Sequence, residues 1–200
     1  MDLDALQQQT TLLVRQKLTA FVNRYVISLP GPDGGDGALV AFVEQKRLAF
    51  REEVTFFADE AKTTPLFRFK ARQILDLGAT YDVTAMDGSP IGTFRKDFKK
   101  SLLRSTWHLE QPMPDGQLLA AVGRERSTFI AVLRRVWDLA ENLPFPFKYH
   151  FDFVAAEKPV MSVDKTALIR DRYRVEISEP GLDRRLAIAM AVALDALQSR

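Results

Sequence analysis

The chain has 200 residues, of which 46% are hydrophobic and 27% are charged, and it contains no cysteine. A chain of this size and composition buries one core, so we expect a single domain over residues 1–200. The absence of cysteine excludes disulfides, thiolate zinc sites and cysteine nucleophiles. The net charge of +2 is far below the Lys and Arg excess of a dedicated nucleic-acid binder, so nucleic acid is not an expected partner.

The first residues, MDLDALQQQTTLLVRQK, are acidic and then polar. They lack the basic start, the apolar stretch and the small-residue cleavage site of a signal peptide. We therefore expect a cytoplasmic protein in which residues 1–10 form a loosely ordered leader.

Most of the chain alternates apolar and polar residues with the period of a β-strand. In LFRFKAR, Phe67 and Phe69 alternate with Arg68 and Lys70, so a strand would carry apolar groups on one face and cations on the other. Turn-forming stretches such as PGPDGGDG and MDGSP separate the strands, and Asp87-Gly88 predicts a hairpin. Many short strands at this spacing predict a mainly β fold, either a sandwich or a barrel. The other segments of this kind are TLLVRQKL, RYVISL, ALVAFVEQKR, EVTFFAD, TYDVTAM, IGTFRK, STWHLE, QLLAAVGRE, KYHFDFVA and YRVEIS.

Two segments have a helical pattern instead. STFIAVLRRVWDLAENLP places its apolar residues on one helical face, which predicts an amphipathic surface helix over Ser127–Leu143. The closing RRLAIAMAVALDALQ is rich in alanine and has no polar face, which predicts a central helix over residues 183–198. It is too short for a conventional membrane span, so we expect a closed sheet to surround it.

The segments YDVTAMDGSPIG and KDFKKSLLRSTW, together with the apolar C-terminal segment, resemble the LURP-one-related proteins of the bacterial branch of the tubby C-terminal-like superfamily. The phospholipid scramblases are more distant members. The resemblance implies a closed, largely antiparallel β-barrel of about twelve strands around a hydrophobic C-terminal α-helix. It also implies a link to membranes, because tubby domains bind phosphoinositide headgroups through basic residues. The cysteine cluster and the acidic calcium segment of scramblases are absent from this sequence, so calcium-driven lipid flipping is not expected.

The densest cluster of cations lies in FRKDFKKSLLR, and a second set lies in LFRFKAR. If the two sets share an outer face, they could bind the phosphate oxygens of an anionic headgroup. The alternative is an ordinary solvated face that protects the sheet from edge pairing. The candidate ligand-binding residues are Arg95, Lys96, Lys99, Lys100, Arg104, Arg68, Lys70 and Arg72.

The sequence offers little for catalysis or metal binding. His150 and Asp152 could form a base with an orienting carboxylate, but His108 and His150 both fit ordinary packing or surface positions better. We expect no catalytic residues, no metal and no cofactor.

The preferred hypothesis is a non-enzymatic barrel that binds anionic phospholipid or a membrane surface, with a peripheral location at the inner membrane face. The alternative is a protein-interaction or stress-regulatory module whose unknown protein partner meets the Ser127–Leu143 helix or the LPFPF tip. A hydrolase ranks last, because no base, nucleophile and oxyanion site occur in one constellation.

Overall fold

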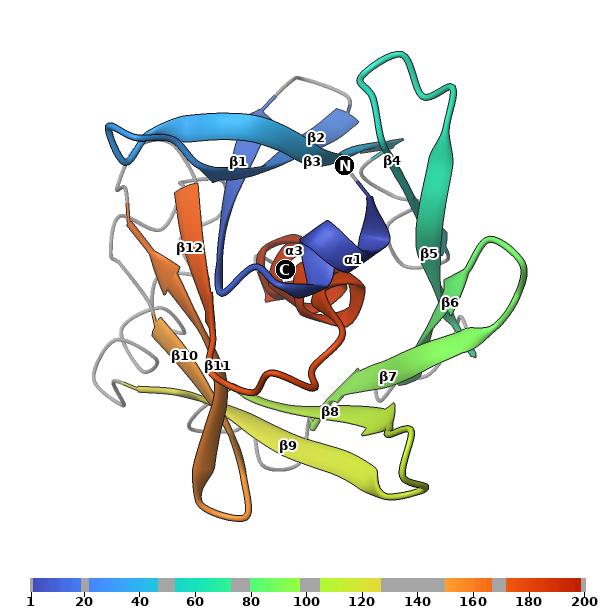
Figure 1. Ribbon diagram of the computed structural model, residues 1–200, viewed down its shortest axis with the longest axis vertical. Helices are drawn as coiled ribbons and strands as arrows, with labels where there is room; N and C mark the ends of the chain where they lie inside the picture. Colours follow the sequence, from blue (N-terminus) through green and yellow to red (C-terminus); the bar gives the residue numbers. More distant parts are fainter. Residues whose placement is uncertain are drawn as a thin grey trace, which may run out of the picture.

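Twelve antiparallel strands close into a barrel around one helix (Figure 1). The structure is a computed structural model that describes residues 2–18, 22–46, 53–72, 80–97, 105–126, 150–166 and 172–198. Each strand pairs with the next one along the chain, and β12 pairs with β1 to complete the ring. The prediction of a closed, mainly β barrel around a C-terminal helix is confirmed. The strands are β1 (Thr11–Leu18), β2 (Val22–Pro30), β3 (Asp36–Lys46), β4 (Glu53–Phe57), β5 (Pro65–Ala71), β6 (Thr80–Ala85), β7 (Pro90–Lys96), β8 (Thr106–Pro112), β9 (Leu118–Glu125), β10 (His150–Ala155), β11 (Lys158–Lys165) and β12 (Arg172–Ile177).

Alternating burial along each strand explains why these segments form a wall. Phe67 and Phe69 of β5 point into the barrel and are 1% and 0% exposed, whereas Lys70 is exposed on the outer face. The inward rings pack on those of neighbouring strands, since the Phe56 and Phe67 rings stack with their centroids 4.3 Å apart. Burial of this aromatic layer drives closure of the sheet.

The sequence pattern did not single out β11, and a bulge explains the omission. The register between β10 and β11 shifts between Phe153 and Val154. As a result, Val160 and Met161 are consecutive and both buried, at 1% and 2% exposure. Two successive inward residues break the period-two pattern on which the sequence prediction depended.

The hairpin between β6 and β7 confirms the prediction made from Asp87-Gly88. Gly88 has a φ of +88°, a conformation that glycine adopts without steric cost. The Asp87 carboxylate accepts hydrogen bonds from the backbone N–H of Ser89 at 2.9 Å and from its hydroxyl at 2.7 Å. The side chain therefore stabilises the turn as well as starting it.

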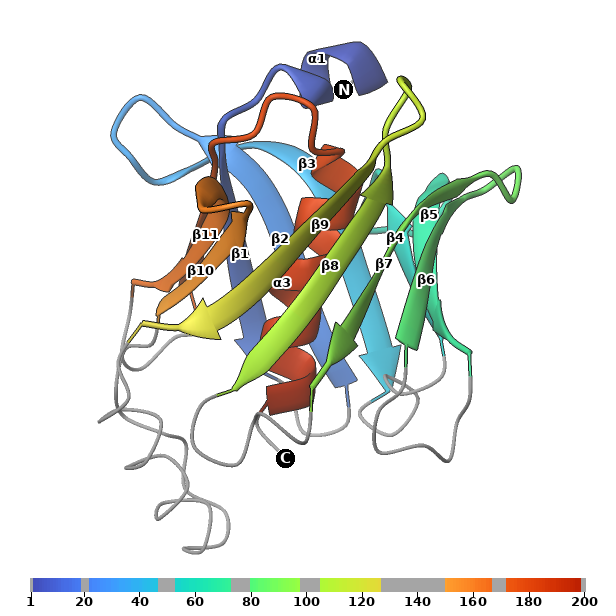
Figure 2. The ribbon, with the colours of Figure 1, turned by 90° about the horizontal axis from the view of Figure 1, so that it is seen from below.

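The helix α3 (Arg184–Gln198) runs through the interior of the barrel (Figure 2). Every residue from Leu186 to Leu194 is 0% exposed, which confirms that the barrel encloses the apolar segment. Small residues allow close approach: a Cβ on Gly92 of β7 would lie 2.6 Å from a Leu186 methyl group and 2.6 Å from the Glu110 carbonyl oxygen. The missing polar face of α3 is thus explained by enclosure within protein.

Side chains from distant parts of the chain cap the N-terminus of α3. The Asp183 N–H donates to Gln111 Oε1 at 2.7 Å, the Arg184 N–H to Gln7 Oε1 at 3.1 Å, and the Arg185 N–H to Asp183 Oδ1 at 2.8 Å. These bonds satisfy backbone donors that have no partner inside a helix. Burial raises the pKa of Asp183, but hydrogen bonds from Arg185 and Gln7 outweigh it and hold that pKa below its ordinary value.

A buried carboxylate anchors the other end of α3. Asp195 is 7% exposed and accepts hydrogen bonds from the hydroxyl groups of Tyr25 on β2, at 2.6 Å, and of Tyr173 on β12. Gln16 of β1 donates to the Tyr25 oxygen at 3.1 Å. An acid near a helix C-terminus is disfavoured by the helix dipole, so these donors are needed to hold it there.

Several predictions concern regions that the structure leaves untested. The predicted surface helix Ser127–Leu143 lies outside the described residues. Part of the predicted leader forms α1 (Leu3–Gln7), in which Leu6 is 6% exposed. That residues 1–10 are loosely ordered, and that residues 1–200 form one domain, stay predictions.

Candidate anion-binding surface

Two of the candidate cations on β5 lie beside one acidic residue of β4. Arg68 and Lys70 both point outward, and Glu53 is opposite Lys70 in the register of the two strands. The Glu53 carboxylate lies 3.5 Å from a guanidinium nitrogen of Arg68 and 3.9 Å from Nζ of Lys70. All three side chains are at least one third exposed, so each contact contributes little to stability. Glu53 nevertheless offsets part of the positive charge of this face.

Arg72 forms the best-defined ion pair of the candidate surface. Its Nε lies 2.9 Å from Asp82 Oδ2 and its terminal nitrogen lies 2.7 Å from Asp82 Oδ1, a two-point contact between a guanidinium and a carboxylate. The hydrogen bond to Asp82 raises the pKa of Arg72. A phosphate would have to compete with Asp82 for this guanidinium.

The register of three strands places Arg72 and Arg95 in one row. The Arg72 N–H donates to the Thr80 carbonyl oxygen at 2.9 Å, and Thr80 is the partner of Arg95 across β6 and β7. Two strand spacings separate the arginines, about 10 Å between Cα atoms. The structure therefore brings one cation from each predicted set onto the same outer row.

Lys96 does not share the outer face with Arg95. Successive residues of a strand point to opposite faces, and Lys96 follows the inward pattern of Phe94. Its Nζ lies 5.8 Å from the centroid of the Trp107 ring, which is 0% exposed and belongs to the core. Arg95 and Lys96 thus present their charges on different sides of the wall.

Three candidate residues, Lys99, Lys100 and Arg104, lie outside the described residues. In the sequence, the described residues that flank them are Asp97 and Ser105. The Asp97 N–H donates to the Thr106 carbonyl oxygen at 2.8 Å. That the cations of both sets converge into a single site stays a prediction.

Charge is unevenly distributed between the two ends of the barrel. The five hairpins that join β2 to β3, β4 to β5, β6 to β7, β8 to β9 and β10 to β11 lie at one end, together with α1 and the start of α3 (Figure 2). We call it the hairpin end. Its connecting segments, 2–10, 31–35, 58–64, 86–89, 113–117, 156–157 and 178–183, contain a single basic residue, Lys62. Their acidic residues are Asp2, Asp4, Asp33, Asp59, Glu60, Asp87, Asp115, Glu157, Glu179 and Asp183. Lys158 at the start of β11 and Arg184 and Arg185 at the start of α3 add three basic residues beside these segments.

The remainder of the chain must therefore carry the positive balance, since the whole has a net charge of +2. Arg72 follows β5 and Arg95 is the second-last residue of β7, and both strands run away from the hairpin end. The two arginines lie at the opposite end of the barrel. An anionic surface would repel the hairpin end.

Each histidine contacts a carboxylate on the barrel wall. His108 Nε2 lies 3.2 Å from Asp97 Oδ2, and His150 Nδ1 lies 2.6 Å from Asp164 Oδ1. Asp152, the carboxylate that the sequence offered as an orienting group for His150, binds Arg126 instead. Within the described ranges, no three metal-ligating side chains gather into a site that could hold an ion.

Comparison with curated proteins gave no match, and comparison with solved structures gave none. Among the helices of the described residues, none is long and apolar enough to cross a membrane. The family model described as LURP-one-related matches residues 39–195, which is most of the chain. This match includes most of β3, all the later strands and most of α3. The chain belongs to the LURP-one-related family.

Proposed function

We propose that this protein is a non-enzymatic binding module that docks on anionic phospholipid headgroups, with the hairpin end facing away from the membrane. The observation that carries the proposal is the excess of acidic residues at the hairpin end of a chain whose net charge is positive. Such a charge distribution orients the barrel in the field of an anionic surface before contact is made. We further propose that the protein is cytoplasmic and associates peripherally with the inner membrane face.

The binding residues of the proposal begin at the end of β7 that lies opposite the hairpins. Arg95 lies on the outer row of β7, and Lys96 lies at the end of the same strand. Lys99, Lys100 and Arg104 follow in the sequence. Each cation near an anionic membrane contributes about 1 kcal/mol. We assign a smaller share to the β5 cations Arg68, Lys70 and Arg72, because Glu53 and Asp82 already balance part of their charge.

The architecture supports a binding role rather than catalysis. The helix α3 fills the barrel interior, so a substrate could bind only outside the ring of strands. The twelve strands around an apolar C-terminal helix also agree with what the resemblance to the tubby C-terminal-like superfamily implies. We propose that wider relationship, and the distant one to phospholipid scramblases, on this architectural agreement.

Sedimentation with vesicles of phosphatidylcholine and increasing phosphatidylglycerol tests the proposal. Arg95→Glu changes the charge by two units, so we expect about 30-fold weaker binding, equivalent to about 2 kcal/mol. Lys158→Glu makes the same change at the start of β11, next to the hairpin end, and serves as the matched control, for which we expect less than about 2-fold change. Binding should also weaken steeply as salt is raised. Equal binding by the wild type and by a variant with Arg95, Lys96, Lys99, Lys100 and Arg104 all reversed to glutamate would contradict the proposal.

A further inference from the structure

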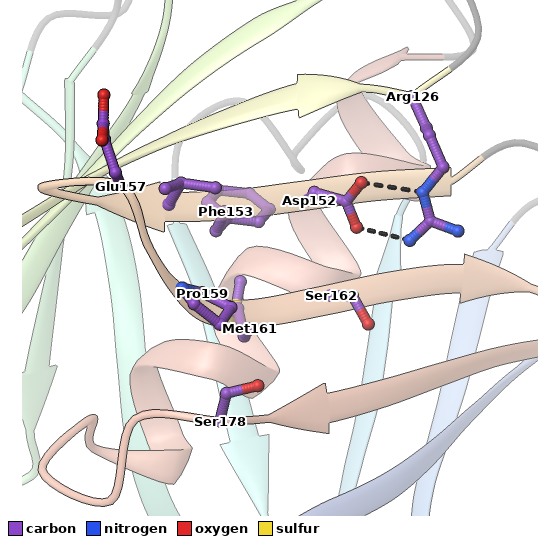
Figure 3. A pocket seen from close by; sticks show the side chains of 9 residues that line it. Arg126, Asp152, Phe153, Glu157, Pro159, Met161, Ser162 and Ser178 are labelled. Carbon is purple, nitrogen blue, oxygen red and sulfur yellow. Dashed lines mark hydrogen bonds and ion pairs between the residues drawn. The ribbon is translucent and has the colours of Figure 1, made fainter.

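The outer wall of the barrel is hollowed where β10 and β11 meet (Figure 3). The hollow, here called the β10–β11 cavity, has a volume of about 360 Å³, which is in the range of small-molecule sites. It lies on a different part of the wall from the row that contains Arg72 and Arg95. Its lining residues are Arg126, Asp152, Phe153, Val154, Glu157, Pro159, Met161, Ser162 and Ser178.

The bulge in β11 and small side chains account for the hollow. At the bulge, the Val160 carbonyl oxygen accepts the backbone N–H groups of Ser178 at 2.9 Å and Glu179 at 3.0 Å. Ser162 and Ser178 present only hydroxymethyl groups on this side, so the wall is thin there. Bulges commonly occur next to binding sites, because they change the direction of the side chains around them.

The turn that joins β10 to β11 is held in an unfavourable conformation. Ala156 and Glu157 both have positive φ, at 45° and 65°, and Ala155 pairs with Lys158 on either side of them. This two-residue turn normally requires glycine or asparagine, because a Cβ is disfavoured there. A strained backbone persists where the surrounding structure holds it, and such positions cluster at ligand sites. Glu157 belongs to both features, since it forms part of the turn and lines the cavity.

Charges in the cavity favour a cation. Arg126 and Asp152 form a two-point ion pair, with nitrogen–oxygen distances of 2.7 and 2.5 Å. The hydrogen bond from Arg126 lowers the pKa of Asp152, so the carboxylate stays ionised at neutral pH. The Glu157 carboxylate stands at the tip of the hairpin, and it has no hydrogen bond or ion pair within the part of the chain that is described. Arg124 lies opposite Asp152 on β9, but the lining residues themselves have a net charge of −1, from Asp152 and Glu157 against Arg126, which favours an ammonium group over a phosphate.

The cavity also offers an apolar contact surface. Val154 is 37% exposed and is one of few large apolar side chains so exposed among the described residues. Pro159, its partner across the two strands, is exposed as well. The Ser162 and Ser178 hydroxyl oxygens provide acceptors beside this apolar surface.

We propose that the β10–β11 cavity binds a small organic cation with an apolar body, recognised as an alkylammonium group. The ammonium group lies between Asp152 and its strand partner Ser162, where it shares the Asp152 carboxylate with Arg126, and its hydrocarbon part covers Val154 and Pro159. A free amine and the side chain of a lysine in a peptide share this chemistry. The site is separate from the proposed headgroup surface, so either assignment can fail without the other.

Titration of the full-length protein, followed by amide chemical shifts, tests the proposal. The probes are n-hexylammonium, hexanoate and N-acetyl-lysine N-methylamide, which distinguishes peptide lysine from a free amine. We expect saturable shifts at Val154 and Ser162 with one or both cations, and none with hexanoate. Shifts with neither cation, or equal shifts with hexanoate, would overturn the proposal.

Two variants test charge and space separately. Asp152→Asn removes the carboxylate of the cavity, and we expect at least about 10-fold weaker binding of the cation. Asp82→Asn is the matched control, because Asp82 forms a similar ion pair with Arg72 on another part of the wall and should leave binding unchanged. Ser162→Leu fills the cavity without a change of charge and should abolish the shifts at Val154. Full binding by both Asp152→Asn and Ser162→Leu would show that the cation binds elsewhere.

Discussion

Asp195 joins the last turns of α3 to two strands of the barrel wall, and its replacement by asparagine isolates that link. The carboxylate accepts hydrogen bonds from Tyr25 and Tyr173 in a site where Asp195 is 7% exposed. Asparagine keeps the shape but has one acceptor oxygen, so its amide nitrogen must face one of the hydroxyl groups. That hydroxyl group can accept from the amide nitrogen but loses the acceptor for its own hydrogen, and the other hydroxyl group loses the charge that strengthens its hydrogen bond.

The expected cost follows from these two bonds. A hydrogen bond to a charged group contributes about 1.5–3 kcal/mol, and a neutral one about 1 kcal/mol. Removing an acid from the C-terminal turn of a helix returns about 0.3–1 kcal/mol. We expect Asp195→Asn to lower the free energy of unfolding by about 2–3 kcal/mol.

Urea unfolding of four proteins measures this cost and its origin. The wild type, Asp195→Asn, Tyr173→Phe and the double variant form a cycle, for which we expect a coupling of about 1–3 kcal/mol. Glu176→Gln, an exposed acid on the same strand as Tyr173, should change stability by less than about 0.5 kcal/mol. If Asp195→Asn were as stable as the wild type, or the coupling were zero, the reasoning about this anchor would be refuted.

Three other changes test the fold in separate places. Ala156→Gly and Glu157→Gly should each raise the free energy of unfolding by about 1 kcal/mol, measured in urea, because each residue has a positive φ. Gly92→Ala should lower it by at least about 2 kcal/mol, since the new methyl group would lie 2.6 Å from both Leu186 and a backbone oxygen; a neutral effect would mean that α3 sits farther from β7. The pKa of Asp183 is lowered in the native state, so its contribution is complete above its ordinary value of 3.8 and is lost as pH falls through the lower native value. Below about pH 4, Asp183→Asn should accordingly lose less stability than the wild type, as measured by acid unfolding. The same loss in both proteins would exclude this contribution of Asp183.

The sequence predicted the wall and the helix well, because both depend on local patterns. Phe67 and Phe69 alternate with cations as an inward-facing strand requires, and Asp87-Gly88 forms the hairpin that its residue types favour. The all-apolar stretch from Leu186 to Leu194 requires enclosure, and the barrel provides it. The strand β11 was missed because its bulge hides the alternation that marks the others.

The candidate site was less predictable, because its charges interact across strands. Glu53 and Asp82 lie beside the β5 cations because of the register of β4, β5 and β6. That register cannot be read from the sequence. Similarly, Asp152 forms an ion pair with Arg126, which follows β9, and not with His150, which is two residues away in the sequence. The β10–β11 cavity had no sequence signal beyond an Ala-Glu pair where a tight hairpin favours glycine. Asp195 had one usable signal, since it is the one charged residue of α3 after Arg185.

Hydrogen exchange of the α3 amides tests most directly whether the barrel encloses the apolar C-terminal helix. We expect the amides from Leu186 to Leu194 to exchange only through global unfolding, as slowly as the best-protected wall strands. Their rates should stay the same when phosphatidylglycerol vesicles are added, because the helix contacts protein and not lipid. Faster exchange in α3 than in the wall, or a change in its exchange on addition of vesicles, would contradict the account.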